Sequence, residues 1–313
     1  MFVCVMQEDK SENEEWSNAG EGIIVGKHAY LLMAHNDWSL LSKLLQCLDD
    51  SRNSIFIHID KKSDFNKSDI YVPKNAKTSY IPRRSVSWGG YSQIAVELDL
   101  LAAATAEGYD YYHHISGQDV PIKSQSYIHS FFDDQVDALN YIGVHTGSDL
   151  EEIVDGRLGQ HHFFQDSIGQ NSGIWCAGIE FLENKSLALQ RRFKVNRVSR
   201  IPVKVYKVTN WFSITHEMAQ YVVSRKSDIQ KWFKSSLCAD ELFLQAIAMD
   251  SPYKETISYS TLREIDWKRG KPYTYHIEDY SMLMESERLF ARKFSTSTDS
   301  EIIEKICNKL LNT

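Results

Sequence analysis

The first 140 residues alternate short apolar strand patterns with amphipathic helix patterns, and this alternation restricts the possible folds more than any other feature. Strands are expected at 29–33, 54–60, 78–81 and 110–115. Leucines at helical spacing predict a helix over 38–48, and a second helix is predicted around Ile94, Leu98, Leu101 and Ala102. Alternation of this kind produces a mostly parallel sheet with helices on both faces. The sequence therefore predicts an α/β fold with a doubly wound sheet of nucleotide-binding type.

The second half of the chain has a less regular pattern, with a strand-like stretch at 203–212 and helical stretches at 217–223 and 237–249. No Pro/Gly-rich linker separates it from the first half. Residues 1–26 are acidic and polar and are predicted to form a disordered tail. Residues 27–313 are predicted to form one composite domain. Its nucleotide-binding half covers about 28–145, and its acceptor and catalytic half about 146–313.

The bulk composition excludes several classes of protein. With 35 Lys and Arg against 42 Asp and Glu, the net charge is −7, which argues against a nucleic-acid binder. No apolar run approaches the roughly 18 residues of a membrane span. The cysteines are five in number, scattered and without a Cys-x-x-Cys pair, which favours free thiols and a reducing compartment. We therefore expect a cytoplasmic protein, and association with a membrane through partners stays open.

The segment 111–121 is the first candidate site, because an aromatic strand runs directly into a turn that carries Asp119. Ligands of open α/β sheets bind at the carboxyl ends of the strands. The segment Gly117–Pro121 also consists of ordinary turn-forming residues, so by itself it predicts a bend as readily as a site.

His58 and Asp60 lie two apart on a predicted strand, so both side chains project from the same face at its carboxyl end. They could hold a divalent metal, or Asp60 could contact a nucleotide while His58 packs. One acid makes a poor magnesium or manganese site, which favours the nucleotide contact. The adjacent pairs His113-His114 and 161–162 point to opposite faces of a strand and cannot chelate one ion.

Two charged pairs lie in the second half. Asp240 and Glu241 open a predicted helix, where acids commonly stabilise the helix dipole but where a carboxylate could also act as a general base. Arg292 and Lys293 lie between Phe290 and Phe294. Flanking aromatic residues would hold these cations in place, as a binding site for a diphosphate requires.

Taken in order, these features resemble the core-2/I-branching family of glycosyltransferases (family 14), which includes the peptide O-xylosyltransferases. The resemblance covers about residues 28–295. It rests on eight pieces in the family's order: Ala29–His35, Ile57–Ser63, Ser87–Gly90, Ile115–Lys123, Asn210–Phe212, Asp240–Phe243, Ile265–Trp267 and Leu289–Phe294.

The resemblance implies a GT-A-like fold and an inverting enzyme that uses a UDP-sugar, of the UDP-GlcNAc or UDP-xylose type, and a glycan acceptor. No metal cofactor is implied. The implied base is Glu241, the implied diphosphate ligands are Arg292 and Lys293, and Asp119 and Asp240 are implied to lie near the acceptor or behind the site. The remaining implied contacts with the nucleotide-sugar are Met33, Asp60, Ser87, Trp88, Asn210 and Trp211. Val208-Thr209 stands where the family often has Gly-Ser, and Asn210 where it often has Asp; both departures fall near the sugar and acceptor, so the donor sugar stays open. Ala239 stands where the family often has Pro.

The residues also leave other functions open. One is a metal-dependent transferase with Asp60 as a ligand. Another is a glycosidase in which Asp119 and Glu241 form a carboxylate pair. A third is a glycan-binding protein without catalytic activity.

Overall fold

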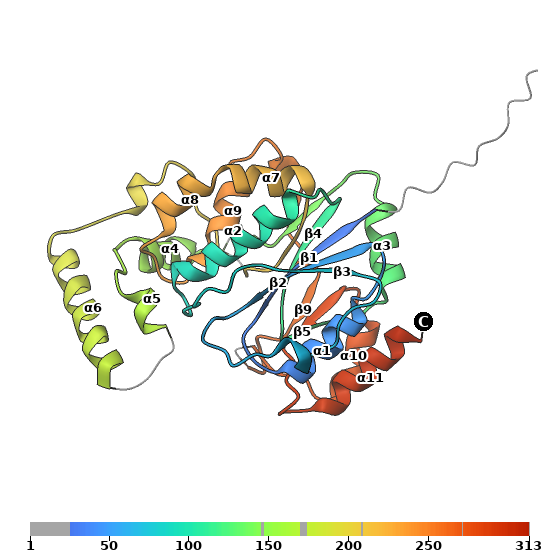
Figure 1. Ribbon diagram of the computed structural model, residues 1–313. Helices are drawn as coiled ribbons and strands as arrows, with labels where there is room; N and C mark the ends of the chain where they lie inside the picture. Colours follow the sequence, from blue (N-terminus) through green and yellow to red (C-terminus); the bar gives the residue numbers. More distant parts are fainter. Residues whose placement is uncertain (1–25, 145–146, 170–173, 208, 271, 313) are drawn as a thin grey trace, which may run out of the picture.

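The computed structural model describes residues 26–144, 147–169, 174–207, 209–270 and 272–312. The predicted α/β fold is confirmed (Figure 1). A seven-stranded sheet has the order β3-β2-β1-β4-β7-β6-β8. Its strands are β1 (His28–Ala34), β2 (Asn53–Ile59), β3 (Lys77–Tyr80), β4 (Tyr111–Ser116), β6 (Asn140–Ile142), β7 (Phe212–Thr215) and β8 (Ile257–Ser258). The first four strands are parallel, and β7 runs antiparallel to both β4 and β6.

A smaller sheet of three short strands lies below the main one, in the order β5-β10-β9. It consists of β5 (Asp119–Pro121), β9 (Arg263–Ile265) and β10 (Phe290–Arg292). In this sheet β10 is antiparallel to β5 and parallel to β9. Three segments that are far apart in sequence therefore meet next to the carboxyl end of β4.

Helices cover both faces of the main sheet. The helices are α1 (Trp38–Cys47), α2 (Tyr91–Thr105), α3 (Gln125–Asp133), α4 (Leu150–Leu158), α5 (Gln165–Ile168), α6 (Ile174–Arg192), α7 (His216–Ser224), α8 (Lys226–Phe233), α9 (Phe243–Met249), α10 (Tyr280–Glu285) and α11 (Ser300–Leu311). One core joins α2, α7, α8 and α9 to one face of the sheet, and a second joins α1 and α3 to the other. A third core packs α11 and α10 against α1 and the small sheet.

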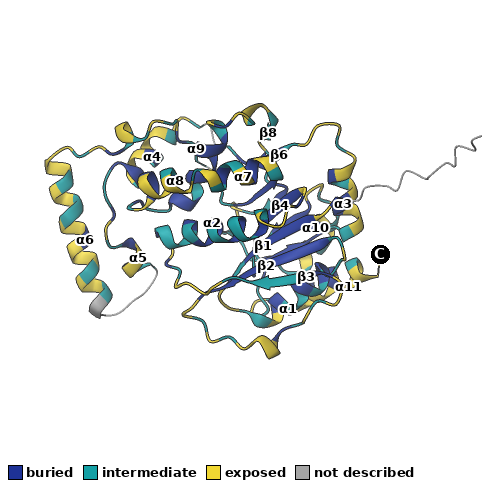
Figure 2. Cartoon of the chain, turned by 45° about the horizontal axis from the view of Figure 1, so that its top comes forward, coloured by how far each residue is buried: buried dark blue, intermediate teal, exposed yellow. Residues whose placement is uncertain are grey.

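The inner strands of the sheet are buried because both faces are covered, as the dark blue colour of β1, β2 and β4 in Figure 2 shows, whereas the edge strand β3 is only partly buried. In β1, alternate side chains divide between the two cores: Ala29 and Leu31 join the first, and Tyr30 and Leu32 the second. This is why the sequence of β1 is apolar throughout and does not alternate with polar residues.

Two expectations for the second half are wrong in detail. The strand-like stretch 203–212 forms a strand only from Phe212 onward, as β7. Val203 and Val205 pack against the first core without joining a ladder, so their apolar character reflects burial and not strand pairing. The single helix expected at 237–249 is divided into a 3₁₀ turn, Ala239–Glu241, and α9, because Leu242 leaves helical geometry with φ −131°.

Residues 1–25, most of the expected acidic tail, lie outside the described residues. Of the five cysteines, the four that the structure describes are free, as expected. None of the helices in the described ranges is long and apolar enough to cross a membrane.

Candidate active site

The carboxyl ends of β1, β2 and β4 meet at one edge of the sheet. In register, Met33 of β1 lies beside His58 of β2 and Ser116 of β4. Asp60 follows β2 directly, and its N–H donates to the carbonyl of Ala34 (2.9 Å). The structure thus brings the predicted nucleotide-side residues Met33 and Asp60 to the edge where a ligand of an open sheet binds.

The carboxylate of Asp60 accepts hydrogen bonds from two backbone N–H groups, those of Lys62 (2.8 Å) and Val86 (3.4 Å). It therefore links the loop after β2 to the segment that leads to Trp88. The neighbouring His58 accepts from the N–H of Arg84 through Nε2 (3.0 Å), and burial lowers its pKa to about 4. His58 is thus a neutral packing group, and Asp60 is the polar group left to face a ligand.

Arg292 is fixed by three groups at once. Its guanidinium donates to Ser116 Oγ (2.6 Å) and to Asp119 Oδ1 (3.0 Å) and lies over the ring of Trp211, 4.5 Å from its centroid. The other oxygen of Asp119 accepts from the N–H of Ser116 (2.6 Å). With a side chain only 2% exposed, Asp119 is a buried counter-ion of Arg292 and is not placed to donate a proton to a substrate.

Trp211 also stacks on His114. The two rings stack with centroids 5.3 Å apart and an interplanar angle of 23°. Nδ1 of His114 lies 2.8 Å from the carbonyl oxygen of Asn210, which can only accept, so this nitrogen carries the proton. Burial lowers the pKa of His114 to about 4, which keeps the ring neutral, and Nε2 lies 3.4 Å from the sulfur of Met33. Met33, Trp211 and Arg292 therefore belong to one contiguous wall.

His113 and His114 contact different groups on opposite sides of β4, as predicted. His113 faces His28 and Ser213 and not the wall that contains Trp211. Sequence reasoning had assigned no role to His114, because its partners Asn210 and Trp211 are about 100 residues away in the chain.

Lys293 follows Arg292 and is half-buried. Its backbone pairs with Tyr273 and Tyr275. Burial, and then the neighbouring Arg292, lower the pKa of its ammonium. In the described part of the chain, this ammonium has no carboxylate partner. A half-buried cation without a counter-ion, beside one that has a counter-ion, is suited to bind an incoming anion.

His35 is a further group at this edge that the sequence did not single out. It follows β1, and burial lowers its pKa, which the charge of Asp60 opposes and those of Arg292 and Lys293 reinforce. The same ring thus lies within the electrostatic reach of the predicted nucleotide residue and of the predicted diphosphate residues. Residues that the sequence related only by motif therefore lie around one locus.

Glu241 ends the 3₁₀ turn, and its side chain is 32% exposed. Its Oε2 accepts from the guanidinium of Arg157 on α4 (2.6 Å), which also donates to the carbonyl of Cys238 (3.2 Å). Arg157 was not identified from the sequence, because it lies 84 residues before Glu241. It holds the carboxylate in one orientation, as a general base requires before it accepts a proton.

Glu241 and Arg157 line an open cavity of about 610 Å³. The buried Arg263 also lines it and donates to the carbonyls of His114 (3.0 Å) and Phe212 (2.9 Å). The charge of Asp119 acts on Arg263, which connects the cavity to the Arg292 network. The rest of the wall consists of Gly143, Val144, Lys207, Thr209, Tyr259, Thr261, Ile265 and Trp267.

The turn Ser87–Gly90 connects the nucleotide edge to Glu241. The N–H of Cys238 donates to the carbonyl of Gly89 (2.8 Å), where φ is +70°, and Ser87 Oγ donates to the carbonyl of Asp166 (2.5 Å). A Cβ on Gly90 would collide with the carboxylate of Asp166, which accepts hydrogen bonds from Ser92, so α5 packs closely against this turn. Trp88 is left 53% exposed and free to contact a ligand.

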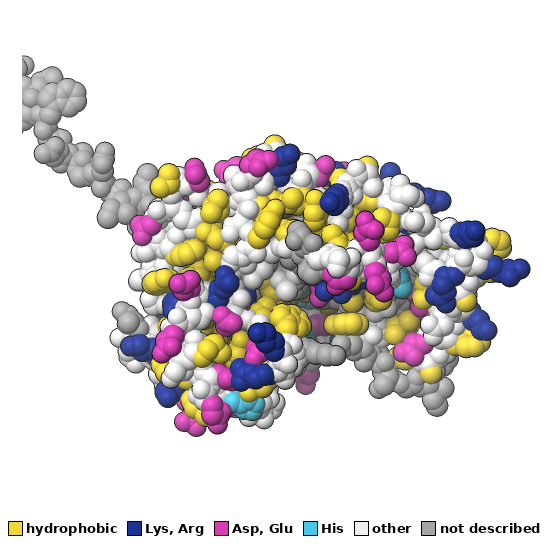
Figure 3. Space-filling model, turned by 180° about the vertical axis from the view of Figure 1, so that it is seen from behind, with side chains coloured by type: hydrophobic (Ala, Val, Ile, Leu, Met, Phe, Trp, Pro, Cys, Tyr) yellow, Lys and Arg dark blue, Asp and Glu magenta, His cyan; other side chains and the backbone are white. Residues whose placement is uncertain are grey.

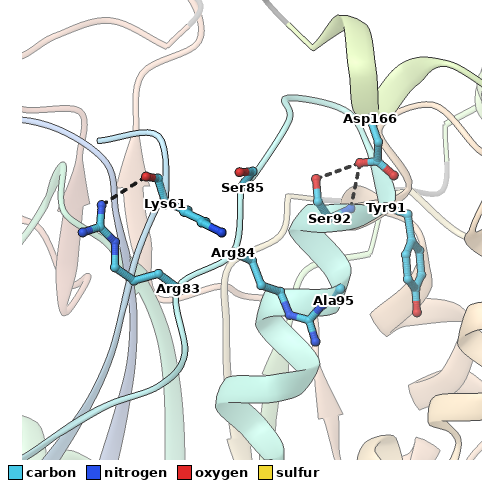
Figure 4. A pocket seen from close by; sticks show the side chains of 8 residues that line it. All are labelled: Lys61, Arg83, Arg84, Ser85, Tyr91, Ser92, Ala95 and Asp166. Carbon is cyan, nitrogen blue, oxygen red and sulfur yellow. Dashed lines mark hydrogen bonds between the residues drawn. The ribbon is translucent and has the colours of Figure 1, made fainter. Parts of the chain in front are cut away.

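A second, shallower cavity of about 420 Å³ lies on the outer side of this turn (Figure 4). Arg83 donates to the carbonyl of Asp60 (2.7 Å), and Arg84 pairs with Asp99 (2.7 Å). Both arginines therefore hold the loops around Asp60 in place. The residues that line this second cavity are Lys61, Arg83, Arg84, Ser85, Tyr91, Ser92, Ala95 and Asp166.

Two acids are buried behind Glu241. Asp240 accepts from the side chain of Gln93 (3.2 Å) through Oδ2, whereas its Oδ1 and both oxygens of Glu97 have no hydrogen-bond partner. Burial, and then the charge of Glu241, raise the pKa of Asp240 to about 7. Burial, and then Asp240, raise the pKa of Glu97 well above its ordinary value. Asp240 is therefore buried next to Glu241 in the chain, with Gln93 as its side-chain hydrogen-bond donor.

Asp240→Asn is expected to raise stability at high pH and to change it little at pH 4. The pKa of the Asp240 carboxyl is raised from its ordinary value of 3.8 to about 7 in the folded protein. Its contribution to the free energy of unfolding is therefore full below pH 3.8 and is lost as the pH rises through the folded-state pKa. The amide of the variant does not titrate, so the variant does not lose this stability. Thermal unfolding from pH 4 to 9 measures the difference. Glu255→Gln, whose side chain is 87% exposed, is the control. An equal shift at every pH would contradict the titration of Asp240.

Comparison with known proteins shows to which family the chain belongs. The family model of the core-2/I-branching enzymes matches residues 28–285. The chain belongs to this family. It is 22% identical over 306 residues to human xylosyltransferase 2, covering 88% of this chain and 33% of that protein. It is 24% identical over 297 residues to xylosyltransferase sqv-6 of Caenorhabditis briggsae, covering 82% and 33%. The chain thus spans about a third of the length of these relatives.

The chain therefore belongs to a family of glycosyltransferases, enzymes that transfer a sugar to an acceptor. This membership argues against the glycosidase alternative. The structure agrees for Asp119, because a carboxylate paired with Arg292 and 2% exposed cannot serve as the acid of a glycosidase pair.

Proposed function

We propose that this glycosyltransferase transfers a sugar from a UDP-sugar, of the UDP-GlcNAc or UDP-xylose type, to a hydroxyl group of a glycan, with inversion and without a metal ion. One observation carries the proposal. Arg292 and Lys293 lie at the carboxyl edge of the parallel strands, where nucleotides bind in such sheets, and the nearby cavity contains an oriented carboxylate, Glu241.

The donor half of the site would use the residues around Asp60. Met33 and Asp60 would contact the uridine, with Ser87 and Trp88 at the border of the nucleotide-sugar. Asn210 and Trp211 would form a wall of the sugar pocket. When UDP leaves, negative charge grows on its diphosphate, and preorganised cations stabilise that charge in the transition state. Arg292 is preorganised by Ser116, Asp119 and Trp211, so little reorganisation is needed during the reaction.

The acceptor half would use the cavity that Glu241 faces. At about 610 Å³ it lies within the size range of ligand pockets. Tyr259 and Trp267 line it and are 63% and 53% exposed, so both present aromatic surface on which a sugar ring can pack. Glu241 would withdraw the proton of the attacking hydroxyl during attack, a contribution of about 10²–10⁴-fold.

Independence from metal is supported by the ligands available around Asp60. Magnesium and manganese require several oxygen ligands, and the carboxylate of Asp60 is occupied by two backbone N–H groups. In the described ranges, the one group of three side chains spaced for a metal is His276, Glu278 and Asp299, which does not include Asp60. The two cations supply the positive charge that a metal would otherwise bring to the diphosphate.

Thermal unfolding in the presence of nucleotides tests the donor class. A ligand that binds only the native state raises its unfolding temperature. UDP and at least one UDP-sugar are expected to do so equally in EDTA and in manganese, and GDP is expected to have a smaller effect. Stabilisation that requires manganese would support the alternative with Asp60 as a metal ligand. Stabilisation by GDP alone would overturn the proposed donor class.

A further inference from the structure

Helix α6 has the reverse of the amphipathicity of a surface helix. Its large apolar side chains point outward: Phe181, Leu182, Leu189 and the adjacent Phe193 are 59%, 54%, 57% and 71% exposed. Leu189 lies eight positions after Phe181 and seven after Leu182, and Phe193 lies four after Leu189, so all four residues fall on one side of the helix. A surface helix of a globular protein ordinarily directs such a stripe toward the core.

The opposite face of α6 anchors the helix through polar contacts. Glu183 is 5% exposed and lies 3.1 Å from Nδ1 of His162. Gln190 accepts from the N–H of His161 (2.7 Å) and donates to its carbonyl (2.9 Å). Contacts of Glu183 and Gln190 with the two histidines, His161 and His162, thus fix the outward direction of the apolar stripe. The helix is not loosely attached.

Basic residues lie along the C-terminal half of α6 and in the segment that follows it. Residues 184–207 contain eight Lys or Arg and no Asp or Glu, in a chain whose net charge is −7. Lys185 and Arg192 lie on the outer face at helical spacing from the exposed apolar residues, and Arg191 and Lys194 are also exposed. Glu180 is the exposed acid of the helix. The eight are Lys185, Arg191, Arg192, Lys194, Arg197, Arg200, Lys204 and Lys207.

The helix also stands out from the rest of the molecule. In Figure 1 it lies at the left edge, apart from the sheet and its covering helices, and in Figure 2 it is mostly exposed. Figure 3 shows the molecule from behind, so the end at the left of Figure 1 is at the right. At this end, Lys and Arg side chains gather with hydrophobic ones. A projecting face of this kind fits a broad, flat partner better than a narrow groove.

We propose that the outer face of α6 binds the surface of an anionic lipid bilayer, with its four large apolar side chains inserted at the headgroup level and the flanking cations against the lipid charge. Amphipathic helices with Lys/Arg around Phe and Leu bind membrane interfaces in this way. The charge complementarity selects anionic lipid. The proposal is independent of the donor and of Glu241, because α6 contributes no residue to the cavity that Glu241 lines.

Sedimentation of the full chain with vesicles tests the proposal. The chain is expected to pellet with vesicles of phosphatidylcholine containing phosphatidylglycerol, and more weakly with phosphatidylcholine alone. Binding should decrease as salt is added, since the surface potential is screened. Two double variants, Phe181→Ser with Phe193→Ser and Lys185→Glu with Arg192→Glu, should each lower the apparent partition coefficient at least about tenfold.

A matched control lies in the loop before β3. Val72 is 58% exposed and Lys74 is exposed, so Val72→Ser with Lys74→Glu makes the same two kinds of change elsewhere on the surface. This variant should bind vesicles like the wild type. Transfer to a soluble acceptor should be unchanged in all of these variants, which separates the lipid proposal from the proposed function.

Three results would overturn the proposal: no binding to either kind of vesicle, equal binding by the α6 variants and the wild type, or equal affinity for neutral and anionic vesicles. Sedimentation velocity gives a further test. If the wild type forms a dimer and the α6 variants lose it but still bind vesicles, the proposal is overturned and α6 is assigned to contact with a second copy of the chain. Circular dichroism of each variant establishes that it is folded before these comparisons.

Discussion

Glu241→Gln is expected to lower the rate of sugar transfer by about 10²–10⁴-fold while the affinity for UDP stays unchanged. The amide cannot accept a proton, but its oxygen can still accept the hydrogen bond that Arg157 donates to Glu241 (2.6 Å). The geometry of the turn is therefore kept, and only the basicity is lost. Single-turnover transfer rates and calorimetric titration with UDP measure the two quantities separately.

The control for this variant is Glu287→Gln, an exposed carboxylate on the segment before β10. It should transfer sugar at the wild-type rate. Transfer by Glu241→Gln at the wild-type rate would remove Glu241 from the mechanism. Loss of UDP affinity along with transfer would instead place the side chain at the donor, where it would act by positioning and not as a base.

Replacement of both cations, Arg292→Ala with Lys293→Ala, is expected to weaken UDP binding far more than uridine binding. A hydrogen bond to a charged group contributes about 1.5–3 kcal/mol, so two such losses correspond to about a 10²–10⁴-fold loss of affinity for the diphosphate. Uridine has no phosphate and is expected to lose little. Equal loss for both ligands would place the pair away from the diphosphate.

The two cations differ in what their removal does to the fold. Arg292 neutralises the buried Asp119, and removal of one partner from a buried pair costs about 3–5 kcal/mol. Lys293 has no such partner in the part of the chain that the structure describes, so Lys293→Ala should leave the unfolding temperature near that of the wild type. Adding Asp119→Asn to the double variant removes the uncompensated charge and keeps the UDP comparison interpretable.

The main sheet could be predicted from the sequence because its signals are local. The run of apolar residues from Ala29 to Met33 and the helical spacing from Leu40 to Leu48 depend on neighbours within a few residues. The same reasoning failed at Val203 and Val205, which are apolar because they pack against the core but which do not pair with a strand. It also missed the small sheet, whose strands have three residues each and therefore too few positions to show alternation.

The candidate site was predicted in outline, through motifs in order, but not in its contacts. Nothing near Asp119 indicates that its counter-ion is Arg292, which lies 173 residues later. Arg157 has no local pattern that identifies it as the partner of Glu241. Such pairs depend on how distant segments fold together, so single-sequence periodicity does not contain them. The positions could be expected from family resemblance; the ion pairs and stacks became visible only in the structure.

The measurement that tests the central claim most directly is the reaction itself, carried out in EDTA with UDP-xylose and UDP-GlcNAc and a panel of oligosaccharide acceptors. The product is examined by NMR for the configuration of the new linkage. We expect one UDP-sugar to give UDP and an elongated glycan with a β linkage from the α-linked donor. A product with retained configuration, or one formed only after manganese is added, would contradict an inverting, metal-independent transfer with Glu241 as the base.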